Sequence, residues 1–249
     1  MDIKISGSGV VSAGEYDVVS ISGSGRVNGA IRCKKFRASG SVHAEGDVEC
    51  AGEVSTSGSS AFDKNVTAVT VRTSGSAKVV GDLTAEKEVR IAGGFRCEGK
   101  ISGGTIRLDG RASVDGGVEA NEVWVQGVLA CPGLVNAETV DIVCDGSGME
   151  LGGIGGTTIR VCATSKGKAG HKSPRLPLLS SLLENKSTDA GILVIGQIEG
   201  DNIALEDVTT PSVTGKIVAI GEGCHIDLVQ YSDQVEISPD AVVGKVEKI

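Results

Sequence analysis

The sequence contains very few aromatic residues and little proline. Among 249 residues there are one Trp, two Tyr, three Phe and five Pro, whereas Gly occurs 37 times. Globular cores usually bury much of their apolar area in aromatic side chains, and this composition argues against such a core. Hydrophobic residues still make up 40% of the chain. We therefore expect a thin, layered core of Val, Ile, Leu, Ala and Cys, because small β-branched side chains pack well between pleated strands.

The sequence also lacks a basic excess and any long apolar run. The formal net charge is −8, which argues against nucleic-acid binding. No run of about 18 apolar residues is present, so no transmembrane helix is expected. Met1-Asp2-Ile3-Lys4 leads directly into patterned sequence, without the features of a signal peptide. These absences predict a cytoplasmic protein.

A glycine-rich unit recurs along the chain. The glycines that begin the units are Gly7, Gly23, Gly40, Gly58, Gly75, Gly93, Gly110 and Gly127. Successive steps between these marker glycines are 16, 17, 18, 17, 18, 17 and 17 residues. Four, eight and ten residues after the marker the side chains are mostly apolar, which is the alternation of a strand. Six residues after it stands a second glycine in most units, which fits a bend with positive φ or a close backbone approach.

A unit of this length has no second layer against which to bury its apolar face. Stacking solves this, because each coil can pair with the next at about 4.8 Å and the apolar positions become continuous columns. The sequence therefore predicts an all-β fold: a single-stranded parallel β-helix, or β-solenoid, with about 17 residues per coil. We expect coils over residues 1–162, an insertion loop with a short helix near 178–183 over residues 163–190, and further coils over residues 191–249.

Both tips of the predicted solenoid look like ordinary strands. A bare tip exposes apolar side chains and unpaired strand edges, and contacts between such edges do not close on themselves, so they produce filaments. The alternative is a terminal coil capped by its own charges, Lys245, Glu247 and Lys248. The candidate polymerisation residues are Ile3, Ile5, Val10 and Val11 at one tip and Val235, Ile237, Val242 and Val246 at the other.

Two stretches of the repeat and one near the end resemble a known family. The units "ISGSGRVNGAIRCKKFRASGS" and "GDLTAEKEVRIAGG", with the later "GKIVAIGEGCHIDLVQYSDQVEIS", resemble the bactofilins, bacterial polymer-forming cytoskeletal proteins, and in particular the longer Firmicutes-type members. The resemblance implies a right-handed parallel β-helix of triangular section. It also implies nucleotide-independent, end-to-end polymerisation of the protein with itself, as a scaffold often found beside the membrane. The internal insertion departs from the family pattern.

The insertion is the second candidate site. Its basic residues are Lys166, Lys168, Lys172 and Arg175, and its apolar residues are Leu178, Leu179, Leu182 and Leu183. Basic residues followed by an apolar patch can bind an anionic membrane surface. A solvated loop whose leucines pack on the solenoid is the favoured interpretation. The alternative function is therefore a monomeric β-helix module that docks a partner, such as a membrane protein, or the membrane itself through this insertion.

No catalytic or cofactor-binding arrangement emerges from the sequence. His43, His171 and His225 are the only histidines. Left-handed β-helix acyltransferases combine stacked coils with a catalytic His, but they need a hexapeptide repeat that this chain lacks. The run "GGIGGTTI" lacks the Gly-Lys-Ser/Thr ending of a phosphate loop. We expect no enzyme and no cofactor, with a β-helix acyltransferase as the least favoured alternative.

The seven cysteines form no CxxC pair, which argues against a disulfide framework and a closed zinc site. Buried, reduced thiols that pack as small apolar groups are the favoured interpretation. Cys33 and Cys50 occupy equivalent positions of adjacent units, within disulfide range, so a redox switch stays open as a less favoured alternative. Cys97 and Cys131 also share a position, but Val114 between them should keep them too far apart to bond.

Overall fold

The computed structural model describes residues 1–145, 148–163 and 193–249. The regular secondary structure of these residues consists of β-strands, and none of them forms a helix long and apolar enough to cross a membrane. The strands are β1 (Ile3–Ala44), β2 (Val48–Phe62), β3 (Val66–Val79), β4 (Leu83–Cys97), β5 (Ile101–Val114), β6 (Val118–Cys144), β7 (Met149–Ala163), β8 (Leu193–Ile195), β9 (Ile198–Leu205), β10 (Val208–Ile220), β11 (His225–Ile237) and β12 (Val242–Lys248).

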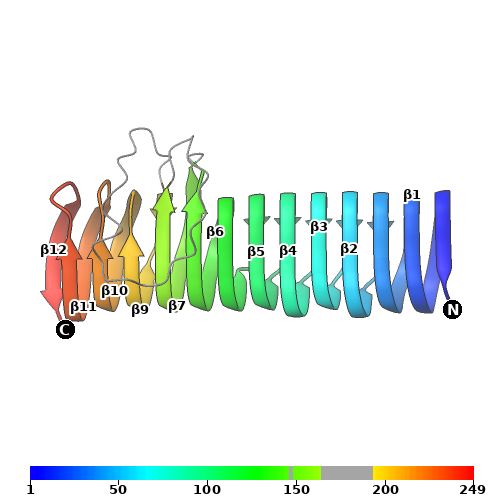
Figure 1. The fold of residues 1–249 in the computed structure, drawn as a ribbon, viewed down its shortest axis with the longest axis horizontal. Coiled ribbons are helices and arrows are strands. Elements are labelled where there is room, and N and C mark those ends of the chain that lie inside the picture. Colours follow the sequence, from blue (N-terminus) through cyan, green and yellow to red (C-terminus); the bar gives the residue numbers. More distant parts are fainter. Residues whose placement is uncertain (146–147, 164–192) are drawn as a thin grey trace. The chain divides into compact units, whose positions relative to one another are not determined.

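The chain divides into two compact units. The N-terminal unit comprises Met1–Trp124 and Leu129–Gly133, and the C-terminal unit comprises Val125–Val128 and Leu134–Ile249. Within each unit, successive coils lie side by side (Figure 1). β1 to β5 pair one after another in the N-terminal unit. In the C-terminal unit β7 pairs with β8 and β9, both pair with β10, and β11 and β12 follow.

All of these pairings are parallel and follow the sequence repeat. Val48 of β2 pairs with Ile31 of β1 on one side and with Val66 of β3 on the other, and Val66 pairs with Leu83 of β4. One repeat is therefore one coil of the structure. The prediction of an all-β parallel β-solenoid is confirmed.

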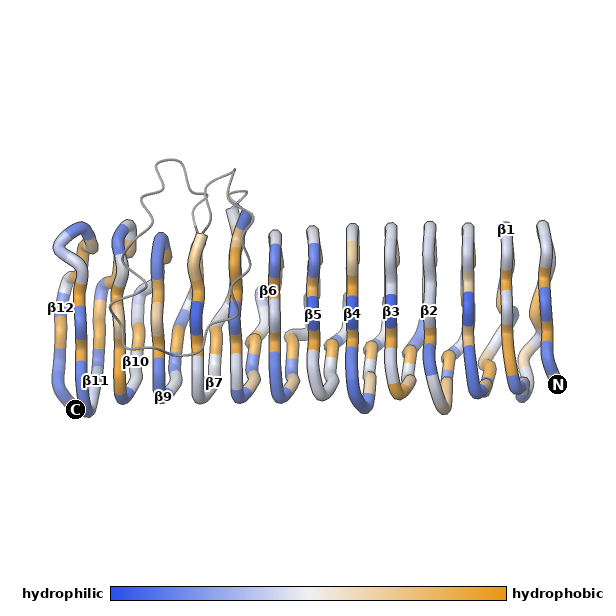
Figure 2. Tube along the Cα trace, viewed as in Figure 1, coloured by the Kyte–Doolittle hydropathy of each residue, from blue (hydrophilic) through white to orange (hydrophobic). Residues whose placement is uncertain are grey.

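The predicted apolar columns form the core. The residues four positions after the markers are at most 3% exposed: Val11, Val27, Ala44, Phe62, Val79, Cys97, Val114 and Cys131. Hydrophobic residues recur at matching positions of successive coils (Figure 2). Two further buried columns flank the markers, two residues before and two after, as with Ile91 and Phe95. Several members of these columns are small or polar, so hydrophobicity alone does not indicate the burial of the whole column.

The buried hydroxyl groups of the flanking columns contact one another. Thr56 donates a hydrogen bond to the hydroxyl of Thr73, and Ser60 donates one to Thr56, each at 3.3 Å. Each of the three side chains is at most 6% exposed. A buried polar group is costly only when it has no partner, so coil stacking makes hydroxyl groups acceptable in this core.

The two glycine columns have different physical causes. The marker glycine Gly58 has φ of 107°, and a Cβ on it would lie 2.3 Å from the carbonyl oxygen of Gly40, one coil earlier. Gly46, six residues after a marker, does not adopt a positive φ. A Cβ on Gly46 would nevertheless lie 2.1 Å from the carbonyl carbon of Gly29. Close backbone approach therefore applies to both columns, whereas the left-handed conformation, which favours glycine, is mainly a property of the markers.

Candidate assembly surfaces

The first coil of the N-terminal unit leaves members of the core columns partly uncovered. Ile5 and Ile21 occupy the same position of successive repeats, yet Ile21 is 2% exposed and Ile5 is partly exposed. The same holds for Ile3, which is partly exposed, and Val19, which is fully buried. Because two neighbouring coils are needed to cover an inward side chain, Ile3 and Ile5 form an incomplete core layer.

The other two residues predicted at this tip lie elsewhere on the coil. Val11 is fully buried in the core, and Val10 beside it is 59% exposed. Successive side chains of a strand point to opposite faces, which places Val10 on the outer flank of the coil. Of the four candidates, Ile3 and Ile5 are therefore the ones on the open face.

Charges hold the first coil in place. The amino group of Met1 lies 2.6 Å from Oδ2 of Asp17, and Nζ of Lys34 lies 2.5 Å from Oδ1 of the same carboxylate. Hydrogen bonds from Lys34, and then from the amino terminus, lower the pKa of Asp17 to about 2. The backbone amide of Asp17 also donates to the Met1 carbonyl at 2.9 Å. The open face therefore belongs to a coil that is held in register.

The last strand of the C-terminal unit shows the same incomplete layer. Val246 of β12 pairs with Val229 of β11, and Val243 pairs with Ile226. Val229 is fully buried and Ile226 is 3% exposed, whereas Val246 is 43% exposed. Val242 pairs instead with His225, an exposed residue. Val242 is 59% exposed and, by this register, lies on the outer flank.

Val235 and Ile237 extend this open face along β11. They pair with Val218 and Ile220 of β10, which are 0% and 2% exposed. The pairing of β12 with β11 covers only His225 to Tyr231. Val235 and Ile237 are consequently partly exposed. Together with Val243 and Val246, they are members of the apolar columns that no further described coil covers at this tip.

The charged residues predicted as an alternative cap lie beside Val246. Lys245 forms an ion pair with Glu247, and Gln230 donates a hydrogen bond of 3.2 Å to the Glu247 carboxylate. The contact with Lys245, followed by that with Gln230, lowers the pKa of Glu247. The exposure of Val246 shows that this side chain remains accessible beside the charges.

The insertion candidates lie outside the described residues. Lys166, Lys168, Lys172, Arg175, Leu178, Leu179, Leu182 and Leu183 all fall within residues 164–192, as do His171 and the expected helix near 178–183. The membrane and partner hypotheses for this segment stay predictions.

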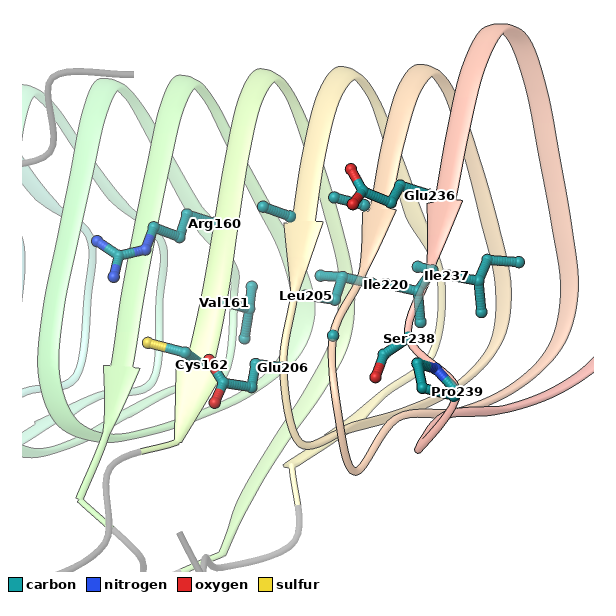
Figure 3. A pocket seen from close by; sticks show the side chains of 13 residues that line it. Arg160, Val161, Cys162, Leu205, Glu206, Ile220, Glu236, Ile237, Ser238 and Pro239 are labelled. Carbon is teal, nitrogen blue, oxygen red and sulfur yellow. The ribbon is translucent and has the colours of Figure 1, made fainter. Parts of the chain in front are cut away.

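A groove crosses four strands of the C-terminal unit. Its lining follows one register line, in which Val161 of β7, Leu205 of β9, Ile220 of β10 and Ile237 of β11 are successive partners. Arg160, Glu206 and Glu236 lie along it in Figure 3. Ala204, Ala219 and Gly221 also line it. The sequence gives no signal for this groove, because its residues are spread over four coils.

Glu206, which lines the groove, has a strongly raised pKa. Burial, followed by the charges of Asp207 and Glu222, raises its pKa to about 7, against the opposing effect of Arg160. The guanidinium Nη1 of Arg160 lies 3.6 Å from Oδ2 of Asp141. A carboxyl that gains and loses a proton near neutral pH makes this groove sensitive to pH.

The two described histidines have separate local partners. His43 Nε2 lies 2.8 Å from Oδ2 of Asp63, and His225 Nδ1 lies 3.3 Å from the carbonyl oxygen of Gly223. Each belongs to a different unit. Over the residues that the structure covers, no group of three or more His, Cys, Asp or Glu side chains is placed to hold a metal ion.

Comparison with known proteins finds a short match to an uncharacterized protein. No family model matches the chain, and no solved structure matches it. A stretch of 63 residues is 35% identical to the uncharacterized protein YhbF of Bacillus subtilis (strain 168) and covers 25% of this chain. The match covers 27% of that protein's length. The resemblance to bactofilins stays an expectation from the sequence.

Proposed function

We propose that the protein assembles with copies of itself, coil against coil, into nucleotide-independent filaments that serve as a cytoplasmic bacterial scaffold of the bactofilin type. One observation carries this proposal. The apolar columns are buried between coils but partly exposed in the outermost coils. Ile5 is more exposed than Ile21, and Val246 is more exposed than Val229. The terminal coils thus offer surfaces of the kind that the solenoid buries internally.

The physical basis is the same as that of the fold. A coil of a second copy needs only to continue the parallel pairing and to place its inward side chains over the open columns, which is a form of β-augmentation. Burying one Val or Ile side chain contributes about 1.5–3 kcal/mol when it is fully covered. Ile3 and Ile5 are such side chains on the N-terminal face, and Val235, Ile237 and Val246 are such side chains on the C-terminal face. Each added copy brings a further open face, so growth does not close on itself.

Negative-stain electron microscopy of the purified chain without nucleotide tests this function. Filaments are expected for the wild type, and the variant Ile5→Lys should remain folded but unassembled, because a charge would be buried at the contact. Thr67→Lys is the matched control, since Thr67 is an exposed residue of β3 in the middle of the N-terminal unit. Filaments in the control but not in Ile5→Lys support the proposal.

Two outcomes would contradict this proposal. Wild-type particles that stay monomeric in microscopy and in sedimentation velocity would favour the alternative of a monomeric interaction module. If Ile5→Lys formed as many filaments as the wild type, the N-terminal face would not be part of the assembly contact. Circular dichroism of each variant separates loss of assembly from loss of the fold.

A further inference from the structure

We propose that Cys33 and Cys50 form an oxidisable dithiol, which hydrogen peroxide converts into a disulfide that joins two adjacent coils of the N-terminal unit. This modification site is independent of filament assembly. It rests on the register of β1 and β2, on the surroundings of the two thiols and on the contrast with Cys97.

The strand register brings the two residues together. Cys33 of β1 and Cys50 of β2 are direct partners in the parallel pairing. Neighbouring strands lie about 4.8 Å apart, within the Cα separation of about 4.4–6.8 Å that disulfides span. Both residues are buried, each with 5% of its surface exposed.

The backbone next to the pair is irregular. After Cys33 and Cys50 the register shifts, and pairing resumes with Lys35 and Glu53. Gly52 lies in this shift, where a Cβ would come within 2.5 Å of the Lys34 carbonyl oxygen. Because the corner that follows the cysteines is not part of the regular ladder, it can adjust when the two sulfur atoms approach each other.

The surroundings of the pair favour a thiolate on Cys50. Its interaction with the Cys33 thiol lowers the pKa of Cys50 to about 6 and raises the pKa of Cys33. The backbone amides of Gly52 and Phe36 also lower the pKa of Cys50, while burial and the Glu53 carboxylate oppose them. When protonated, the Cys50 thiol donates to the Glu53 carbonyl oxygen at 3.4 Å. The thiolate is the form that reacts with peroxides.

The reaction balances with hydrogen peroxide as the oxidant. The Cys50 thiolate attacks one peroxide oxygen, the O–O bond breaks, and the other oxygen leaves as water after taking up a proton. This gives a sulfenic acid on Cys50. The Cys33 sulfur then attacks the sulfenic sulfur, and hydroxide leaves as water with the proton of the Cys33 thiol. Two thiols lose two electrons in total, and one peroxide becomes two molecules of water.

Cys97 provides an internal contrast. Its register partner is Val114, so it has no thiol beside it in the adjacent coil. It is fully buried, and burial raises its pKa to about 11. Cys131 occupies the same column beyond Val114, is also fully buried, and has its pKa raised by burial. Cys97 therefore lacks the neighbouring thiol that the reaction requires, and burial disfavours the thiolate of both residues.

Peroxide treatment of the folded full-length chain tests the proposal. After quenching, denaturation and alkylation, the count of free thiols should fall from seven to five, that is, seven minus the two joined. Before alkylation, the mass of the oxidised chain should be lower by about 2 Da, the two hydrogens lost on disulfide formation. Peptide mapping without reductant should recover Cys33 linked to Cys50, and dithiothreitol should reverse the change.

Two variants separate the roles of the two residues. Cys33→Ser removes the resolving thiol, so a sulfenic acid on Cys50 should accumulate and be trapped by dimedone. Cys97→Ser is the matched control and should form the disulfide as the wild type does. If Cys33→Ser fails to fold, the peptide map of the wild type decides alone. Seven unchanged thiols, or a disulfide that involves other cysteines, would overturn the proposal.

Discussion

Val246 of β12 stands in register with Val229 of β11, yet Val229 is fully buried and Val246 is 43% exposed. The two residues occupy the same apolar column. Val229 has a coil on each side, since it pairs with Val213 of β10 and with Val246 of β12. Val246 has a coil on one side only among the described residues. Coverage by a neighbouring coil therefore decides whether a column residue is buried, which is the physical basis of the assembly prediction.

Val246→Lys should prevent assembly at the C-terminal face while the chain stays folded. Val242→Lys is the matched control on the same strand, because Val242 is 59% exposed and pairs with the exposed His225 on the outer flank. We expect Val242→Lys to sediment as wild type does and Val246→Lys to sediment as a monomer. Equal loss of assembly in both variants would contradict the division of this strand into an open face and a flank.

Gly58→Ala should destabilise the N-terminal unit by about 3 kcal/mol or more, because strained backbone and steric overlap both contribute. Its φ is 107°, and the new Cβ would lie 2.3 Å from the Gly40 carbonyl oxygen. Gly94→Ala is the control, since a Cβ there meets nothing within 4 Å. Thermal unfolding followed by circular dichroism compares them, and similar melting temperatures for the two variants would argue against the glycine ladder.

Alkylation of Cys50 should depend on pH differently from that of Cys97. The pKa of Cys50 is lowered to about 6, so its thiolate is present above that pH and its rate with iodoacetamide should level off by neutral pH. The pKa of Cys97 is raised to about 11, so its rate should still be rising at pH 9. Mass spectrometry of quenched samples gives both rates, and parallel profiles would contradict this assignment.

Glu206→Gln should stabilise the C-terminal unit at alkaline but not at acidic pH. The pKa of Glu206 is raised from 4.5 to about 7, so the folded state binds the proton more tightly than the unfolded state. Stability is therefore lost as the pH rises through this interval and the penalty is complete above pH 7. Removing the carboxyl should recover about 1–2 kcal/mol at pH 8, a value discounted for partial exposure.

Urea unfolding at pH 4 and pH 8 measures this effect. Glu236→Gln serves as the control, because it removes an exposed carboxylate that lines the same groove and surface changes of this kind usually stay within about 0.5 kcal/mol. A Glu206→Gln variant that is no more stable than wild type at pH 8 would count against burial as the cause of the shift.

The repeat alone determined the coil and most of its core. In a solenoid each coil contacts its neighbours one repeat away, so the period of the sequence is also the register of the sheet, as the pairing of Cys33 with Cys50 illustrates. Apolar positions at fixed distances from the marker glycine are consequently buried wherever a coil lies on both sides. The alternation of apolar residues within a coil and the stacking of neighbouring coils were therefore sufficient to predict which columns point inward.

Only the tertiary structure decided which residues share a surface between coils. Thr56 and Thr73 lie in the core because stacking lets their hydroxyl groups meet, which their polarity alone does not indicate. Val242 and Val246 are both exposed valines of one strand, and only the register with β11 places one on the flank and the other on the open face. The residues that line the groove around Glu206 likewise come from four coils. Burial and pKa depend on neighbours across the stack, and those neighbours follow from the register of whole coils, not from the sequence beside each residue.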